Sequence, residues 1–183
     1  HSYTAACHSA LLAYYLQIDN YVAAEKECEI LMRIAKDLGD ITYEPHDKMG
    51  EIYAARGNYT EALKHFQEDR HIQERIYGPN TTNAALSYTS LAECYLYMND
   101  FDTATDYCNK ALAIYRVCGK EYSLQCARIY ALLAKLCQGK LHIEDALDFA
   151  DKCLAIRKDI LGNEHTLIAD TYTIMSNIYL AID

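Results

Sequence analysis

The chain is organised in segments whose apolar residues recur every three or four positions. In the clearest example, Tyr88, Leu91, Ala92 and Tyr95 fall at i, i+3, i+4 and i+7, so their side chains share one face of an α-helix. The same spacing returns after the polar segment Met98-Asn-Asp100, at Ala104, Tyr107, Cys108, Ala111, Leu112 and Tyr115. No window alternates apolar and polar residues with period two over a convincing length. The pattern therefore predicts an all-helical chain.

This helical pattern repeats with a nearly constant period. An alanine three residues after an aromatic or apolar residue marks each repeat, with separations of 38, 42 and 42 residues between Ala24, Ala62, Ala104 and Ala146. Each second helix is expected to end at a glycine that can adopt positive φ, at Gly39, Gly78, Gly119 and Gly162. The breaks within repeats are predicted at Arg56-Gly-Asn58, Met98-Asn-Asp100 and Gln138-Gly-Lys140. A fifth repeat begins near Met175, so we predict nine helices, of which the last is unpaired.

These residues resemble the tetratricopeptide repeat. The family pattern is matched by Tyr88-x-x-Leu91-Ala92-x-x-Tyr95 followed by Ala104, Cys108 and Ala111. The 42-residue units are longer than the usual ~34 residues and are similar to those of kinesin light chain-like scaffolds. The resemblance implies an all-α fold, a right-handed superhelical α-solenoid of antiparallel helix pairs. We expect a single domain over residues 1–183, with units at about 3–39, 41–78, 81–119, 122–162 and a half unit at 165–183.

Composition narrows the possible functions. The net charge of −9 disfavours nucleic acid as a partner, and no run of ~18 apolar residues predicts a membrane span. The eight cysteines are scattered singly, without a C-x-x-C pair, which argues against a metal site and favours a reducing, cytoplasmic location. No nucleophile elbow, glycine-rich phosphate loop or H-E-x-x-H motif occurs. We therefore expect no catalytic residues, no cofactor and no metal.

The resemblance implies that one side of each first helix lines a concave groove that binds a partner. On a helical wheel this side lies opposite the core positions. The predicted groove residues are Glu44, Asp47, Glu51, Leu86, Thr89, Glu93, Leu96, Tyr97, Arg128, Lys135 and Asn177. They are acidic in the first half of the chain and basic at Arg128 and Lys135. The expected partner is a peptide or helical segment of another protein that carries a basic segment.

Several alternatives stay open at this stage. The groove charges could form an ordinary solvated face, and the repeats could be a regulatory or oligomerisation module of a larger enzyme or a small-peptide receptor. The unpaired last helix offers apolar residues for self-association or for a bound helix. Asp69 and Arg70 occupy positions where other repeats carry apolar residues, so we expect them to find opposite-charge partners in adjacent helices or to open the stacking locally.

Overall fold

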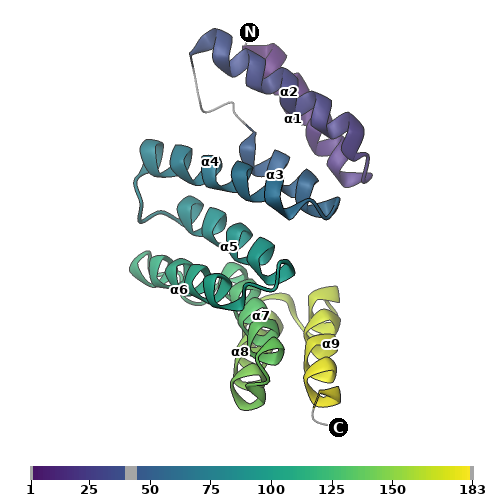
Figure 1. Cartoon of the computed structure of the whole chain (residues 1–183), viewed down its shortest axis with the longest axis vertical. Helices are drawn as coiled ribbons and strands as arrows, with labels where there is room; N and C mark the ends of the chain where they lie inside the picture. Colours follow the sequence, from purple (N-terminus) through teal and green to yellow (C-terminus); the bar gives the residue numbers. More distant parts are fainter. Residues whose placement is uncertain (1, 40–44, 182–183) are drawn as a thin grey trace. The chain divides into compact units, whose positions relative to one another are not determined.

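The computed structural model describes residues 2–39 and 45–181, and within these ranges the chain forms helices joined by short turns (Figure 1). The prediction of nine helices is confirmed for these residues. They are α1 (Ser2–Gln17), α2 (Tyr21–Leu38), α3 (His46–Ala55), α4 (Tyr59–Tyr77), α5 (Thr82–Tyr97), α6 (Phe101–Val117), α7 (Leu124–Gly139), α8 (Ile143–Leu161) and α9 (Thr166–Leu180). Their contacts divide into an N-terminal unit, residues 1–77, and a C-terminal unit, residues 78–183.

The N-terminal unit consists of two antiparallel helix pairs, α1 with α2 and α3 with α4. One apolar cluster joins helices of both pairs, because the small residues Ala5, Ala24 and Cys28 allow close approach of the helices to Leu12 and Ile52. All five of these side chains are buried. Burial of such residues stabilises the fold by roughly 25 cal/mol for each Å² of apolar surface.

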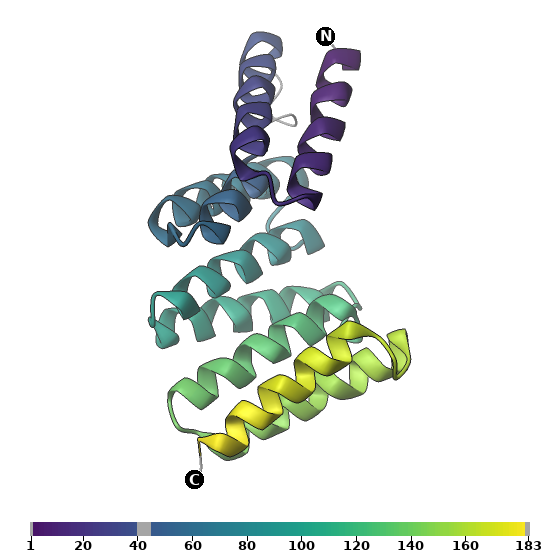
Figure 2. The ribbon, with the colours of Figure 1, turned by 90° about the vertical axis from the view of Figure 1, so that its right-hand side faces the viewer.

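The C-terminal unit contains the pairs α5 with α6 and α7 with α8, and then α9. Figure 2 shows α9, in yellow, running beside α7 and α8. Its buried residues Ile174 and Ile178 pack with Ala127, Ala131 and other residues of α7 and α8. One apolar cluster of this unit contains residues of α5, α6 and α7, and a second contains residues of α7, α8 and α9. Helix α7 therefore connects the two clusters.

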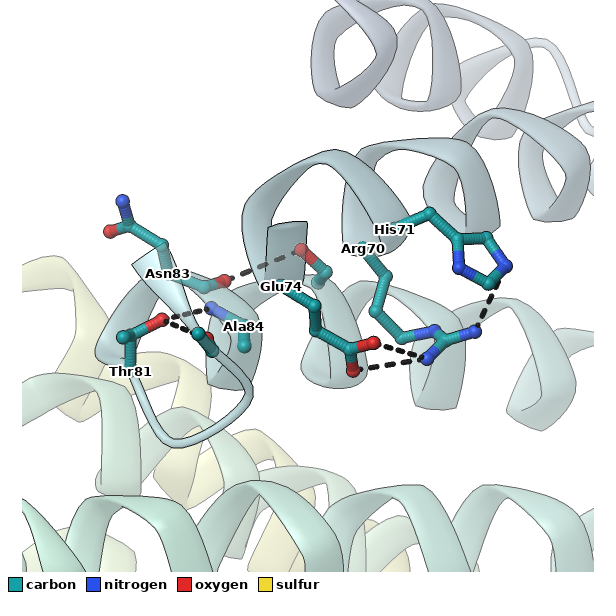
Figure 3. A network of polar contacts seen from close by, with 8 residues as sticks. Arg70, His71, Glu74, Thr81, Asn83 and Ala84 are labelled. Carbon is teal, nitrogen blue, oxygen red and sulfur yellow. Dashed lines mark hydrogen bonds and ion pairs between the residues drawn. The ribbon is translucent and has the colours of Figure 1, made fainter. Parts of the chain in front are cut away.

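Helix termini carry the glycines expected after second helices, and several N-termini are also capped by side chains. Gly39 and Gly119 have φ values of 65° and 65°, the left-handed conformation expected after a helix. At the N-termini, the side chains of Asp100 and Ser123 accept hydrogen bonds from the backbone N–H groups of Thr103 and Cys126. The hydroxyl of Thr81 caps α5 in the same way (Figure 3). These bonds satisfy backbone donors that the helix itself leaves unpaired.

The turn inside the fourth repeat differs from the prediction. The break was predicted at Gln138-Gly-Lys140, but α7 continues to Gly139 and the left-handed residue of the turn is Leu141, with φ 61°. It occupies the repeat position of Asn99 and Gly57, which have φ values of 61° and 75°. Gly139 is the last residue of α7, where a Cβ would lie 2.8 Å from Cζ of Phe101. Its small size is therefore required by packing and not by the turn.

The charged positions Asp69 and Arg70 find partners on their own helix. Nη1 of Arg70 donates to both carboxylate oxygens of Glu74 at 3.0 Å, and Nη2 lies 3.3 Å from Nε2 of His71 (Figure 3). Asp69 is buried, and its Oδ1 accepts a hydrogen bond from Nε2 of Gln73 at 3.2 Å. The bonds from Arg70 to Glu74 and from Gln73 to Asp69 join residues one turn apart in α4.

Candidate binding groove

A cavity of about 540 Å³ in the C-terminal unit brings together four of the predicted groove residues. They come from three first helices: Glu93 from α5, Arg128 and Lys135 from α7, and Asn177 from α9. The remaining lining residues are Leu124, Ala131, Leu132, Arg157, Leu167, Asp170, Thr173 and Ile174. The helical register thus placed these four side chains correctly on one surface, while their role in binding stays a prediction.

The acidic and basic residues of this cavity pair with each other across helices. Nε of Arg128 donates to Oε1 of Glu93 at 2.7 Å, and Nη2 lies 2.5 Å from Oε2. The two side chains remain 46% and 30% exposed, so the pair faces solvent. Such exposed pairs contribute only about 0–1 kcal/mol to stability. The pair nevertheless neutralises the charge of Glu93 and of Arg128. The groove therefore does not present the series of acidic and then basic charges that the sequence predicts.

Apart from the pair of Glu93 and Arg128, the charged residues that line this cavity are Lys135, Asp170 and the buried Arg157, so Lys135 and Asp170 are the exposed charges that remain. Both side chains are exposed and line the cavity from α7 and α9. Among residues 2–39 and 45–181, neither side chain takes part in an ion pair. A bound segment could therefore meet one positive and one negative group beside the apolar surfaces of Leu124 and Ile174.

Arg157 also lines the cavity, although sequence reasoning did not select it. Its side chain is only 7% exposed, and Nη1 donates to the backbone oxygen of Leu167 and to Oγ1 of Thr171, both at 2.8 Å. These bonds join α8 to the beginning of α9 and so position one wall of the cavity. The 42-residue period contained one signal for the burial of Arg157. It lies 42 residues after Tyr115, on the buried face of a second helix.

The other wall of the cavity is tied to α9 near its end. Nε2 of Gln138 donates to the backbone oxygen of Asn177 at 2.9 Å. The side chain of Asn177 lines the cavity beside Thr173, one turn earlier on α9. Both ends of α9 are thus hydrogen-bonded to the preceding helix pair, by Arg157 at the start and by Gln138 at the end.

The predicted groove residues of α5 other than Glu93 divide into three groups. Leu86 and Tyr97 are 40% and 59% exposed, and Leu96 is half-buried against the core. Thr89 is 2% exposed and its hydroxyl donates to the backbone oxygen of Ala85 at 2.9 Å, so its prediction as a surface residue is wrong. A helical wheel treats α5 alone, whereas the burial of a side chain also depends on the structure around the helix.

The acidic groove residues predicted for the N-terminal unit also have a local cation. Nζ of Lys48 lies 3.3 Å from Asp47 and 2.8 Å from Glu51. Burial lowers the pKa of Lys48, but the hydrogen bond and charge of Glu51 and the charge of Asp47 outweigh it, and the pKa is raised. Glu44 lies outside the described residues.

Comparison with known proteins identifies the family. The sequence profile of the tetratricopeptide repeat matches residues 41–116 and 100–159. The chain belongs to the tetratricopeptide repeat family. Two relatives from Arabidopsis thaliana, the proteins Kinesin light chain-related 1 and 3, are 25% and 26% identical over 140 and 135 residues. These matches cover 76% and 74% of this chain but only 23% and 20% of the relatives. The chain therefore spans about a fifth of their length.

Solved structures support the same tetratricopeptide repeat fold. BtubC (BKLC) from P. vanneervenii superposes with a TM-score of 0.80 and 18% identity, covering 96% of this chain and 71% of that protein. A kinesin light chain from Podosopora anserina with nearly identical TPR-like repeats has a TM-score of 0.74 and 17% identity, covering 100% and 88%. At these identities the similarity shows the fold alone.

Tetratricopeptide repeat domains are typical protein-protein interaction modules, and the family is generally non-catalytic. Within residues 2–39 and 45–181, no group of three or more His, Cys, Asp or Glu side chains is arranged to hold a metal ion. In the same ranges no helix combines the length and apolar character that crossing a bilayer requires.

Proposed function

We propose that this tetratricopeptide repeat protein is a non-catalytic scaffold or adaptor that binds a peptide or helical segment in the cavity lined by α5, α7 and α9. The observation that carries the proposal is the convergence of Glu93, Arg128, Lys135 and Asn177 on one cavity of about 540 Å³. The volume of this cavity lies in the range that is typical of ligand sites.

The charges of the cavity indicate the chemistry of the bound segment. Arg128 already holds the carboxylate of Glu93, whereas Lys135 and Asp170 have no ion-pair partner among residues 2–39 and 45–181. We infer a segment of mixed charge, with an acidic group for Lys135 and a basic group for Asp170. An apolar side chain between them would contact Ile174. The basic segment that the sequence suggested, opposite the acidic residues of the groove, is less well supported because Asp47, Glu51 and Glu93 all pair with cations of the chain.

A charge reversal in the cavity tests this proposal. Partners are first captured from the source organism and identified by mass spectrometry, and the segment that binds is then made as a peptide for titration. The variant Lys135→Glu is expected to weaken binding about tenfold. It removes the attraction between Lys135 and the acidic group of the segment and replaces it by a repulsion. Because Lys135 is exposed, the variant is expected to keep its thermal midpoint.

Lys120→Glu provides the matched control. Lys120 is exposed in the turn after α6 and does not line the cavity, yet its reversal changes the net charge by the same amount. Equal affinities for wild-type and Lys135→Glu would reject the cavity as the binding site. Equal losses in both variants would show that net charge, and not this cavity, governs the binding.

We also propose a cytoplasmic location. The eight cysteines are all free thiols, and Cys28, Cys94 and Cys108 are buried with burial raising the pKa of each to about 12. Such thiols act as small apolar core residues, a use that a reducing compartment favours.

A further inference from the structure

The guanidinium of Arg157 is a buried positive charge without a negative charge paired to it. Its side chain is only 7% exposed, and no carboxylate of residues 2–39 and 45–181 forms an ion pair with it. Its hydrogen-bond partners are the backbone oxygen of Leu167 and the hydroxyl of Thr171, which are both neutral. A buried charge is costly unless an opposite charge accompanies it. Arg157 is therefore a position where an anion from outside the described chain would be favourable.

The hydrogen bonds of Arg157 use only one of its three guanidinium nitrogens. Nη1 donates both bonds, each at 2.8 Å, and neither Nε nor Nη2 makes a hydrogen bond within the part of the chain that the structure describes. Nε and Nη2 form the side edge of the guanidinium, whose two parallel N–H groups match the two oxygens of a carboxylate. The edge that binds carboxylates is thus available, while Nη1 holds the start of α9.

A second arginine of the same cavity holds a carboxylate by this edge. Nε of Arg128 donates to Oε1 of Glu93 at 2.7 Å, and Nη2 lies 2.5 Å from Oε2. Arg128 and Arg157 line one cavity of about 540 Å³. The pair of Arg128 and Glu93 is therefore the arrangement that we expect at Arg157 when an acidic group enters the cavity.

The cavity has an excess of positive charge although the chain as a whole is acidic. Arg128, Lys135 and Arg157 line it together with Glu93 and Asp170, three positive against two negative charges, whereas the chain carries −9. Asp170 makes no ion pair with Arg157. The first turn of α9, to which Arg157 is hydrogen-bonded, adds the partial positive charge of a helix N-terminus. The surroundings of Arg157 thus favour an anion.

We propose that the segment bound in this cavity places the carboxylate of an aspartate or glutamate on the Nε–Nη2 edge of Arg157. The inference rests on the proposed function and adds to it a buried contact of the segment, since Lys135 attracts acidic groups at the exposed part of the cavity.

The charge of the cavity favours a carboxylate over a phosphate group. A carboxylate carries one negative charge, which equals the excess of positive charge among the lining residues. A phosphorylated side chain carries about −1.5 to −2 at pH 7 and would leave negative charge unbalanced beside Asp170.

A titration with sodium acetate tests the carboxylate site on the intact chain without any peptide. In nitrogen-15-labelled protein, the Nε–H signal of Arg157 is assigned through its side chain from the backbone amide. We expect acetate to shift this signal saturably, relative to sodium chloride at equal ionic strength. Arg128 is the matched control because Glu93 already holds its side edge. Its Nε–H signal is expected to stay in place in the wild-type protein and to respond to acetate in Glu93→Gln.

The acetate titration has outcomes that reject the site. No shift of the Arg157 signal up to about 100 mM acetate would overturn the proposal, and so would an equal shift of the Arg128 signal in the wild-type protein. Inorganic phosphate is titrated in the same way. A shift with phosphate and none with acetate would assign the site to a phosphate group and overturn the carboxylate.

A double-mutant cycle tests the same site with the bound segment. The peptide identified by capture is amidated at its C-terminus, and each of its Asp or Glu residues is replaced in turn by Asn or Gln. We expect one acidic position whose replacement weakens binding to the wild-type protein about tenfold and has no further effect in Arg157→Lys. Lysine keeps the positive charge and can donate to Leu167 and Thr171, but it lacks the two-pronged edge. The thermal midpoint of Arg157→Lys reports its folding, and the acetate titration does not depend on this variant.

Lys135→Gln separates this inference from the proposed function. An acidic position whose effect disappears in Lys135→Gln and persists in Arg157→Lys would place the carboxylate on Lys135 and overturn the role of Arg157, while the cavity stays the binding site. A peptide that binds elsewhere, together with an acetate shift at Arg157, would overturn the proposed function and support the anion site.

Discussion

Gly50 and Phe66 fit each other so closely that a methyl group at Gly50 would lie 2.5 Å from Cε1 of the Phe66 ring. Gly50 is inside α3, where alanine normally favours the helix by about 1 kcal/mol. Here the clash is expected to dominate, because Phe66 is 4% exposed and has little room to move. We predict that Gly50→Ala lowers the free energy of unfolding by about 1–3 kcal/mol in urea titrations.

A second substitution, Phe66→Cys, is expected to couple energetically to Gly50→Ala. In the next repeat the equivalent pair is Ala92 and Cys108, which share one core cluster. Phe66→Cys alone removes a large buried side chain and is expected to destabilise by several kcal/mol, about 3 or more. In the double variant the two changes should compensate in part, giving a coupling of about 1 kcal/mol or more. Strictly additive effects would contradict the size matching of the two helices.

Leu141 is a position where the protein can be stabilised. Its φ of 61° is unfavourable for a leucine, and its side chain is 72% exposed, so it loses little packing on replacement. We predict that Leu141→Asn raises the free energy of unfolding by about 0.5–1 kcal/mol, because Asn tolerates this conformation and is the natural residue at Asn99. Thermal denaturation should show a rise of about 1–4 °C. An unchanged or lower midpoint would contradict the strain.

The hydroxyl of Tyr115 is a buried group without a hydrogen-bond partner among residues 2–39 and 45–181. The ring is 2% exposed, and burial raises the pKa of the hydroxyl to about 12. We predict that Tyr115→Phe leaves stability unchanged or raises it by about 1 kcal/mol, since no bond is lost. Thr171→Val is the contrasting variant: Thr171 accepts a bond from Arg157, so its loss should cost about 1–3 kcal/mol. A large loss in Tyr115→Phe would reveal a partner for the hydroxyl.

Stability is expected to depend on pH through His65. Burial lowers the pKa of His65 from the ordinary value of 6.5, and the neighbouring His46 lowers it further, although Glu61 opposes this. Below pH 6.5 the unfolded chain therefore binds more protons than the folded chain, and stability falls as the pH decreases. We predict a lower urea midpoint at pH 5 than at pH 7.5, with a smaller difference in His65→Phe. His142→Gln, at an exposed residue, should keep the wild-type pH dependence.

Much of the candidate site followed from helical periodicity. Counting positions from Tyr88 and Leu91 through the 42-residue period placed Lys135 and Asn177 on the same surface, and both line one cavity. The method failed for Thr89 because the wheel describes one helix, whereas burial of a side chain depends on all the helices around it. Arg157 was missed for a related reason: it belongs to a second helix, and only packing brings it to the cavity wall.

The amino-acid sequence by itself determined the helices, their pairing and the repeat family, because these depend on local spacing of apolar residues and on turn residues that recur with the period. Tertiary structure decided which charges pair. Glu93 and Arg128 are 35 residues apart in the sequence, and only the contact between α5 and α7 brings their side chains within 2.7 Å. It also decided that Gly139 is small for packing against Phe101 while Leu141 makes the turn. Such choices depend on distances between helices, which a periodic pattern does not encode.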